Sequence, residues 1–315
     1  MGGALMRRAV FLWTVAVLVL TPGLSRALEV ASLHPLMTDL ARRIGGDRIT
    51  VVELIGSDDN PHEFDPSPRA FAAAADARLI IASGKGLEAS YLGKLRDTLR
   101  PNQEIFEAGR RVHSLVAAEG NPAACCAHHT HTGVIDPHWW HEPTNMSRAG
   151  RDLAEKLGRI DPANAEFYEA NAEAFAEEMA LLDEWIRARV ARIPRARRIL
   201  ATSHLAFGYF CRAYDWTAVA IQGLNREDSA SSRGLGEIVA YLREEKVPAL
   251  FPETGSNPKS LEVIADDLDI ALGQPLYADG TGLPEGKGYE YMMRSNVEAI
   301  VGAIARKDAS ASAGR

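Results

Sequence analysis

The chain has 315 residues, of which 46% are hydrophobic, and it carries a formal net charge of −7. This length and composition allow a sizeable core and are sufficient for two domains. The acidic balance, without a cluster of lysine and arginine, argues against a nucleic-acid partner, because such proteins need basic patches that displace counterions from phosphates.

The N-terminal segment has the pattern of an export signal. Arg7 and Arg8 precede an apolar run over residues 9–20, and the small residues Ser25 and Ala27 suit cleavage directly after Ala27. A membrane anchor is the alternative, but this run of twelve residues is shorter than the roughly 20 that span a bilayer. No cysteine follows the cleavage position to receive a lipid. The sequence therefore predicts a cleaved signal peptide and a soluble protein in the periplasm.

Short β-rich runs alternate with helical patterns in two separate parts of the chain. The helical candidates are residues 34–46 and 67–76 in the first part, and 234–246 and 258–268 in the second. Such alternation indicates parallel sheets covered by helices, which is an α/β fold. The predicted strands are residues 28–32, 49–54, 77–83 and 103–108, and then 197–203, 217–223, 248–253 and 270–277.

The segment 110–135 interrupts this alternation, because it lacks strong periodicity and carries Gly, Pro and a His-rich tract. We expect a long loop, and long loops in compact domains are usually functional or disordered. It contains Cys125 and Cys126, and the third cysteine is Cys211. An oxidising compartment favours one disulfide. Since vicinal cysteines seldom bridge each other, the bond would join Cys125 or Cys126 to Cys211, with Cys126–Cys211 as the candidate pair.

One long helical pattern separates the two parts. Apolar residues recur at three- and four-residue steps from Ala163 to about Ile193. Asp161 suits the N-cap, Pro162 suits the first helical position, and Pro194 ends the pattern. An ordinary surface helix and a strut that restrains two domains are the alternatives, and its position between similar halves favours the strut. The predicted division is a signal peptide at 1–27, an N-terminal α/β lobe at 28–160, the linking helix at 161–194 and a C-terminal α/β lobe at 195–315.

Four polar residues stand where a predicted strand or the long loop ends, two in each half. His62 lies in NPHEFDPSP and His138 in DPHWWHEP. His204 lies in SHLAFGYF and Asp279 in ADGTG. In open α/β sheets, ligands bind beyond the carboxyl ends of strands, so the four residues could meet in one cleft. Three imidazoles and one carboxylate suit tetrahedral zinc, although any single histidine of this kind is more often structural.

These four segments resemble, in order, the ligand segments of the metal-binding solute-binding proteins of bacterial ABC transporters, which deliver zinc or manganese. The resemblance covers nearly the whole chain after the signal peptide. It implies two α/β lobes joined by one rigid helix, with one Zn²⁺ per chain between the lobes. It is greatest to the zinc-binding members, whereas manganese-binding members offer a carboxylate at the third ligand position. The ligands that it implies are His62, His138, His204 and Asp279.

Other residues lie beside that pattern. His141 stands where the second ligand segment usually has an apolar residue, and in a helix it would face the same side as the ligand three positions earlier. Glu63 directly follows the first ligand. Both are candidates for orienting a ligand; simple packing of His141 and a solvated loop position for Glu63 are the alternatives. His34 and His113 are expected to have no metal role.

His128, His129 and His131 cluster in the long loop. Zinc-binding members of the family often carry a His-rich loop at this place, usually a longer one. The resemblance therefore implies a weak zinc-catching site that passes metal to the cleft, and a polar loop without a metal role is the alternative.

The predicted function is high-affinity capture of periplasmic zinc for an inner-membrane ABC permease, without catalysis. A zinc-dependent hydrolase is one alternative, but catalytic zinc keeps an open position that Asp279 would close, and the chain has no H-E-x-x-H helix. A metal-buffering protein or a surface adhesin is another. The expected partners are the permease and a periplasmic zinc metallochaperone, with no nucleic acid, and the protein is expected to be a monomer.

Overall fold

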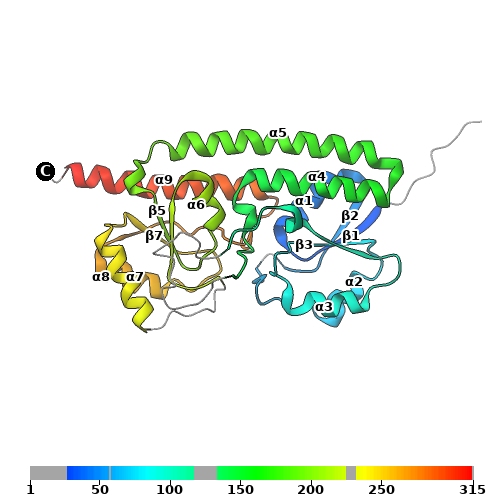
Figure 1. Cartoon of the computed structure of the whole chain (residues 1–315), viewed down its shortest axis with the longest axis horizontal. Helices are drawn as coiled ribbons and strands as arrows, with labels where there is room; N and C mark the ends of the chain where they lie inside the picture. The colour runs from blue at the N-terminus through cyan, green and yellow to red at the C-terminus, as the bar shows by residue number, and fades with distance from the viewer. Residues whose placement is uncertain (1–26, 57, 117–132, 225–231, 314–315) are drawn as a thin grey trace, which may run out of the picture.

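The computed structural model describes residues 27–56, 58–116, 133–224 and 232–313. Two parallel sheets lie at opposite ends of the long axis of the molecule, and a long helix runs over both of them (Figure 1). The strand–helix alternation in the sequence had predicted parallel sheets covered by helices, and this fold class is confirmed.

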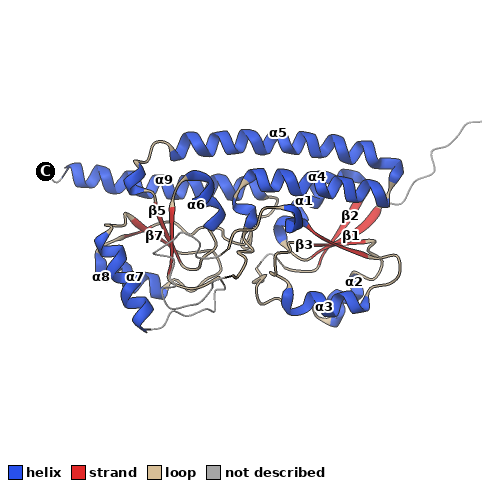
Figure 2. Cartoon of the chain, viewed as in Figure 1, coloured by secondary structure: helices blue, strands red, loops and turns tan. Residues whose placement is uncertain are grey.

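The first sheet has the strand order β2-β1-β3-β4, and all neighbouring strands are parallel. Helix α1 (Pro35–Gly45) covers one face of this sheet, and helices α2 (Pro68–Ala73) and α3 (Ala89–Thr98) lie on the other (Figure 2). The inner strand β3 is buried along its whole length, as a strand covered on both faces should be. The strands of this first sheet are β1 (Leu28–Ser32), β2 (Ile49–Glu53), β3 (Leu79–Ala82) and β4 (Glu104–Glu107).

The second sheet repeats this arrangement with the order β6-β5-β7-β8, again all parallel. The inner strand β5 is also buried throughout. All eight predicted strands are present, each the same length or shorter than its apolar run. The second set is β5 (Ile199–Thr202), β6 (Thr217–Ala220), β7 (Ala249–Phe251) and β8 (Ala271–Leu272).

The four predicted helices of the two lobes are observed, and further helices pack around them. The predicted ones are α1 (Pro35–Gly45), α2 (Pro68–Ala73), α7 (Ser232–Glu244) and α8 (Lys259–Leu268). The additional ones are α3 (Ala89–Thr98), α4 (Pro143–Ile160), α6 (Gly208–Tyr214) and α9 (Tyr289–Ala313). Short 3-10 turns are η1 (Gly46–Arg48), η2 (Ala108–Arg111), η3 (Trp139–His141), η4 (Pro162–Asn164) and η5 (Arg195–Arg197).

The long helix between the sheets is α5 (Ala165–Val190). Its 26 residues correspond to a rod of roughly 39 Å at about 1.5 Å per residue. It packs on α1 and α4 of the first lobe and on α9 of the second. Pro162 begins the short turn η4 ahead of the helix, so the first helical residue lies slightly later than expected. Contacts with both lobes support the strut interpretation of this helix.

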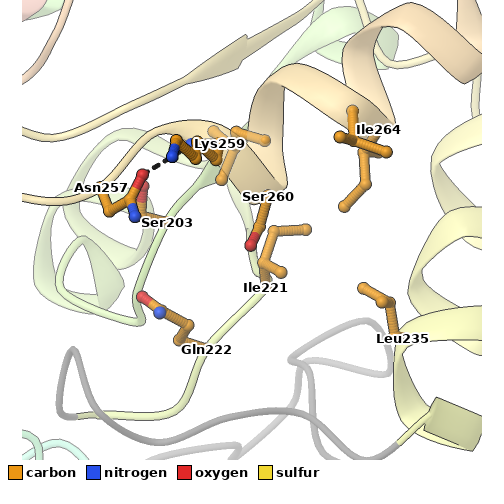
Figure 3. Close-up of a pocket in the computed structure, with 10 residues that line it drawn as sticks. Ser203, Ile221, Gln222, Leu235, Asn257, Lys259, Ser260 and Ile264 are labelled. Atoms are coloured by element: carbon orange, nitrogen blue, oxygen red, sulfur yellow. Dashed lines mark hydrogen bonds between the residues drawn. The ribbon is translucent and has the colours of Figure 1, made fainter.

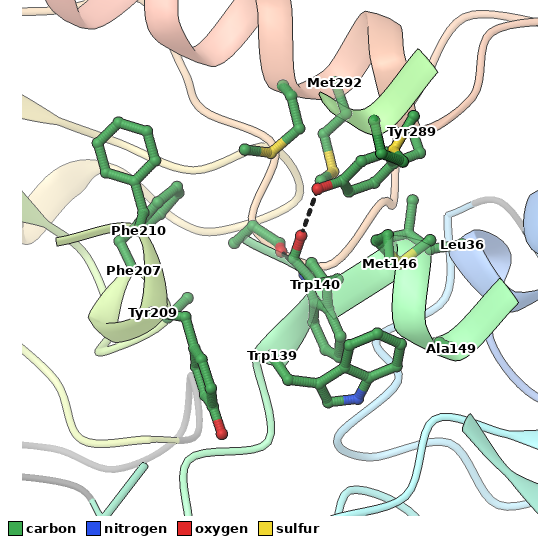
Figure 4. Packing of buried hydrophobic residues seen from close by; sticks show 14 of the residues in the cluster. Leu36, Trp139, Trp140, Met146, Ala149, Phe207, Tyr209, Phe210, Tyr289 and Met292 are labelled. Atoms are coloured by element: carbon green, nitrogen blue, oxygen red, sulfur yellow. Dashed lines mark hydrogen bonds between the residues drawn. The ribbon is translucent and has the colours of Figure 1, made fainter. Parts of the chain in front are cut away.

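One apolar core runs through both lobes. It joins residues of the first lobe, such as Leu79, to residues of the second, such as Phe251. Trp140 lies where the lobes meet, with Tyr289 of α9 beside it, and Trp139 packs against Trp140 on the side of the first lobe (Figure 4). Within the described residues, no helix combines the length and the apolar character that a membrane crossing requires.

The predicted disulfide is not confirmed. Cys211 is a free thiol that is buried in α6, and burial raises its pKa above the ordinary value. Cys125 and Cys126, including the candidate partner Cys126, lie outside the described residues.

Candidate metal centre

Four side chains from both lobes meet at one point. The donor atoms of His62, His138, His204 and Asp279 all lie within 4.8 Å of one another. The Nε2 atom of His138 is 3.1 Å from Nε2 of His62 and 3.2 Å from Nε2 of His204. Oδ1 of Asp279 is 3.5 Å from Nε2 of both His62 and His138. Zinc bonds of about 2.0–2.1 Å in a tetrahedron separate neighbouring donors by roughly 3.3 Å, so the cluster has the size of a zinc site.

The strand ends bring these residues together, as the sequence had suggested. His62 follows β2, in a turn where its N–H donates to Oδ1 of Asn60 at 3.1 Å. His138 directly precedes η3, and His204 lies two residues beyond β5. Asp279 lies three residues beyond Leu276, which forms an isolated parallel bridge with Glu253. All four side chains are at most 3% exposed, so a cation bound among them would be largely dehydrated.

Two buried carboxylates hold two of the histidines in the same way. Oδ1 of Asp136 accepts the backbone N–H of His138 at 2.9 Å and contacts its ring Nδ1 at 2.8 Å. Glu253 accepts the backbone N–H of His204 at 3.0 Å through Oε1, and its Oε2 contacts ring Nδ1. A carboxylate on Nδ1 keeps the proton there, which leaves the Nε2 lone pair available for a metal.

Neither carboxylate was among the residues singled out from the sequence. Asp136 stands two residues before His138, where a carboxylate commonly accepts the N–H of the second residue along the chain, and that spacing is a usable signal. Glu253 is 49 residues from its partner. It becomes a neighbour of His204 only through the pairing of β5 with β7, in which Thr202 lies opposite Phe251.

Charge favours an ionised Asp279. Burial opposes the ionisation of this carboxyl, but the surrounding imidazoles of His62, His204 and His138 hold its pKa well below the ordinary value. A negative oxygen facing three imidazole nitrogens is a suitable donor set for a divalent cation. At Asp136 burial outweighs the neighbouring hydrogen bond and charges, and it raises the pKa of this carboxyl to about 7.

The candidates for orienting a ligand lie in very different surroundings. His141 is fully buried in η3, outside the four-residue cluster, and its Nε2 lies 2.8 Å from the carbonyl oxygen of Ala278. Burial lowers the pKa of His141 to about 3, so the ring is neutral. Glu63 is exposed, and its backbone N–H donates to the carbonyl of Asn60. Its position is that of a solvated loop carboxylate.

The remaining histidines fall into two groups. His34 caps α1, where its Nδ1 accepts the N–H of Leu36 at 3.2 Å, and His113 is exposed; neither belongs to the cluster. His128, His129 and His131 of the long loop lie outside the described residues, so their metal role stays a prediction.

A separate cavity of about 390 Å³ opens in the second lobe. Figure 3 shows its polar end, with Ser203, Gln222 and Asn257, and its apolar wall, with Ile264 and Leu235. Ser203 precedes His204 in the chain, but none of the four clustered side chains lines this cavity. The candidate metal centre is therefore a compact buried cluster that is distinct from this larger pocket.

Comparison with known proteins gives one family over most of the chain. A family described as zinc-uptake complex component A, periplasmic, matches residues 30–303. The manganese-binding lipoprotein MntA of Halalkalibacterium halodurans is 28% identical over 282 residues, which cover 89% of this chain and 89% of that protein.

Two solved structures illustrate the likeness in fold. The laminin-binding protein Lmb of Streptococcus agalactiae, described as having adhesin and metal-transporting activity, has a TM-score of 0.77 at 25% identity and covers 88% of this chain and 100% of its own. The periplasmic zinc-binding protein TroA of Treponema pallidum has a TM-score of 0.77 at 23% identity and covers 88% of this chain and 99% of its own. At this level of identity the likeness to TroA concerns the fold.

Proposed function

Because the chain belongs to the family of periplasmic zinc-uptake complex component A proteins, the metal-binding solute-binding proteins of ABC transporters, we propose that it captures zinc in the periplasm and delivers it to an ABC permease. The proposed ligands are His62, His138, His204 and Asp279. One zinc ion per chain would bind between the lobes as transported cargo, and the protein would turn nothing over.

The observation that carries this proposal is the cluster of three imidazoles and one carboxylate, with donor atoms within 4.8 Å of one another. Zinc accepts nitrogen donors in a tetrahedron, whereas manganese favours oxygen donors and higher coordination. Relatives such as MntA are named for manganese, so family membership does not choose the metal. The third histidine, His204, is the feature of this chain that favours zinc.

The buried carboxylates support metal binding by these histidines. Zinc-binding histidines almost always donate their second ring N–H to a carboxylate, a carbonyl or water. Asp136 and Glu253 occupy that place for His138 and His204. Fixed imidazoles reduce the reorganisation that metal binding would otherwise require, which favours the high affinity that zinc capture needs.

Hydrolysis is a weaker candidate for this site. A catalytic zinc keeps one coordination position open for water, and here a fourth protein donor, Asp279, faces the three imidazoles. The cluster is at most 3% exposed, and the cavity of the second lobe does not include it. An adhesin role, which the description of Lmb includes, is compatible with metal capture and is a separate property.

Growth under zinc starvation tests the proposal. A strain that lacks this protein should grow poorly when zinc is chelated, and zinc should restore growth while manganese should not. The wild-type gene should complement the defect, and His204→Ala should not. Rescue by manganese alone would assign the protein to another metal, and unimpaired growth of the deletion strain at scarce zinc would refute a role in zinc uptake, provided that no second zinc importer operates.

We also propose that the histidine-containing loop helps to load the site, either from free zinc or from a periplasmic zinc metallochaperone. The clustered residues His128, His129 and His131 support this role. Deletion of residues 121–132 should leave the equilibrium affinity for zinc nearly unchanged and slow its uptake at low zinc. Equal loading rates for the deletion variant and the parent, including transfer from a protein donor, would contradict the proposal.

A further inference from the structure

Two buried side chains of the N-terminal half donate to one carbonyl group of the C-terminal half. The indole Nε1–H of Trp140 lies 2.8 Å from the carbonyl oxygen of Ala278, and ring Nε2 of His141 lies 2.8 Å from the same oxygen. Both donor side chains are completely buried. Ala278 directly precedes Asp279 in the chain. We call this group of three residues, Trp140, His141 and Ala278, the clasp.

The two donors are themselves firmly held. The Tyr289 hydroxyl donates to the backbone carbonyl of Trp140 at 2.7 Å (Figure 4). The Trp140 ring packs against the ring of His138, with centroids 5.4 Å apart. The His141 ring packs on Phe207 at 4.4 Å. Because these contacts fix both rings, the clasp holds the Ala278 carbonyl in one place relative to the segment that carries His138.

The hydrogen bond of His141 excludes its Nε2 as a further ligand atom. Its Nε2 lies 2.8 Å from a carbonyl oxygen, which can only accept, so Nε2 carries the proton. The neutral ring therefore has its lone pair on Nδ1, and this atom is buried without a partner among the described residues. His141 also lies outside the set of donor atoms that converge on one point. Its chemistry at this site is donation to Ala278.

We infer that the clasp is a positioning device that fixes the separation between His138 and Asp279, and that it thereby sets the size of the metal site. His138 and Asp279 come from different lobes, and their donor atoms lie 3.5 Å apart. Trp140 and His141 follow one of these residues within three positions, and Ala278 precedes the other. A change of the angle between the lobes that separated the two ligands would therefore also have to break the clasp.

The inference rests on the proposed function, because it assumes that a metal binds at the cluster. Loss of a clasp donor should let Asp279 move away from His138. A small tetrahedral cation such as zinc would then bind more weakly, and a larger cation or one with added water would lose less. The clasp would thus favour zinc over manganese, in addition to the effect of the donor atoms themselves.

The chain offers a matched pair of tryptophans for the test. Trp140→Phe removes the indole donor to Ala278, whereas Trp139→Phe removes an indole donor of the neighbouring residue that serves Ser83 of the first lobe. Both rings are fully buried, so the two substitutions cost similar packing. We expect Trp140→Phe to weaken zinc binding about tenfold and Trp139→Phe to leave it within about twofold of wild type.

His141 offers a second, independent comparison. Glutamine places an N–H close to the position of imidazole Nε2, while phenylalanine keeps the ring shape without a donor. His141→Phe should weaken zinc binding about tenfold, and His141→Gln should restore most of that loss.

In each of the four variants the visible absorption of bound Co²⁺ reports the coordination geometry, because its intensity falls when four-coordination gives way to higher coordination. We expect the Trp140→Phe and His141→Phe spectra to weaken, and the Trp139→Phe and His141→Gln spectra to match wild type.

The possible results separate the clasp from the proposed function. Wild-type zinc affinity and Co²⁺ spectra in both Trp140→Phe and His141→Phe would overturn the clasp and leave zinc capture intact. Equal losses in Trp139→Phe and Trp140→Phe, with no rescue by glutamine, would show general destabilisation and would also overturn it. If the wild-type protein failed to bind zinc, the proposed function would fall, and the Co²⁺ spectra would still decide whether the clasp shapes the site. Should Trp140→Phe not fold, the two His141 variants decide alone.

Discussion

Replacing Glu253 with glutamine should weaken zinc binding strongly without disturbing the fold. Glu253 is fully buried and accepts two hydrogen bonds from one histidine, the backbone N–H and ring Nδ1–H of His204. Glutamine has nearly the same shape but only one acceptor oxygen, and its amide group is a donor. One of the two N–H groups of His204 must then lose its acceptor, or the ring must shift its proton to Nε2 and lose the lone pair that would bind zinc.

The expected size follows from these contacts. A hydrogen bond to a charged group contributes about 1.5–3 kcal/mol, against about 1 kcal/mol for a neutral one, and a buried donor left without an acceptor costs about 1–3 kcal/mol. Since about 1.4 kcal/mol corresponds to a tenfold change in affinity, we expect zinc to bind about 10- to 100-fold more weakly. This is also the usual range when a group that orients a metal-binding histidine is removed.

Competition with a chromophoric zinc chelator at neutral pH measures this change. Glu63→Gln is the matched control, because Glu63 is an exposed carboxylate next to His62 and should leave the affinity unchanged. Urea denaturation of the zinc-free proteins checks that both variants fold. If folded Glu253→Gln bound zinc as tightly as wild type, then Glu253 would not hold the imidazole ready for the metal, and His204 itself would be in doubt as a ligand.

Three further changes test other parts of the same account. His204→Glu should shift the ratio of zinc to manganese affinity toward manganese by about tenfold or more, because it leaves two imidazoles and two carboxylates; a ratio that does not move would assign metal selectivity to the shape of the cleft. Zinc affinity should fall between about pH 7.5 and 5.5, because protons compete with the metal for imidazole nitrogens and free imidazole titrates near 6.5. The lowered pKa of Asp279 keeps that carboxylate ionised over this range, and a constant affinity would argue against histidine ligands. Burial lowers the pKa of His34 to about 3, so below about pH 6.5 the unfolded chain takes up a proton that the folded chain excludes, and the stability of the wild type falls. His34→Asn should remove this loss and make the zinc-free protein less sensitive to acid. Urea denaturation at several pH values measures the difference in unfolding free energy between wild type and His34→Asn. This difference should change by about 1.4 kcal/mol per pH unit in that range, and a difference that stays constant with pH would contradict the prediction.

Much of the fold could be predicted from the sequence because its strands are short, strongly apolar and separated by clear helical patterns. The inner strands β3 and β5 are buried on both faces, so their apolar runs are continuous and easily recognised. Helix α4 was not predicted, although its buried residues Met146, Leu153 and Leu157 recur at helical spacing. That pattern was present in the sequence, immediately after the stretch DPHWWHEP.

The four clustered residues could be found because strand ends and family motifs mark them. Their supporting contacts were harder to find, because they depend on the register of the sheet and on the approach of the two lobes. Glu253 meets His204 because β5 and β7 pair in parallel with Thr202 opposite Phe251. The bond from His141 to Ala278 spans 137 residues. No local sequence pattern predicts this contact, because a buried histidine and a buried alanine can each occur in an apolar core without such a partner.

Metal analysis of the purified protein, after equilibration with zinc and an excess of manganese, tests the central claim most directly. The account predicts one zinc per chain, bound tightly enough that excess manganese does not displace it, and strong loss of that zinc when His62, His138 or His204 is replaced singly by alanine. Retention of manganese in place of zinc, or zinc binding that survives all three single replacements, would contradict it.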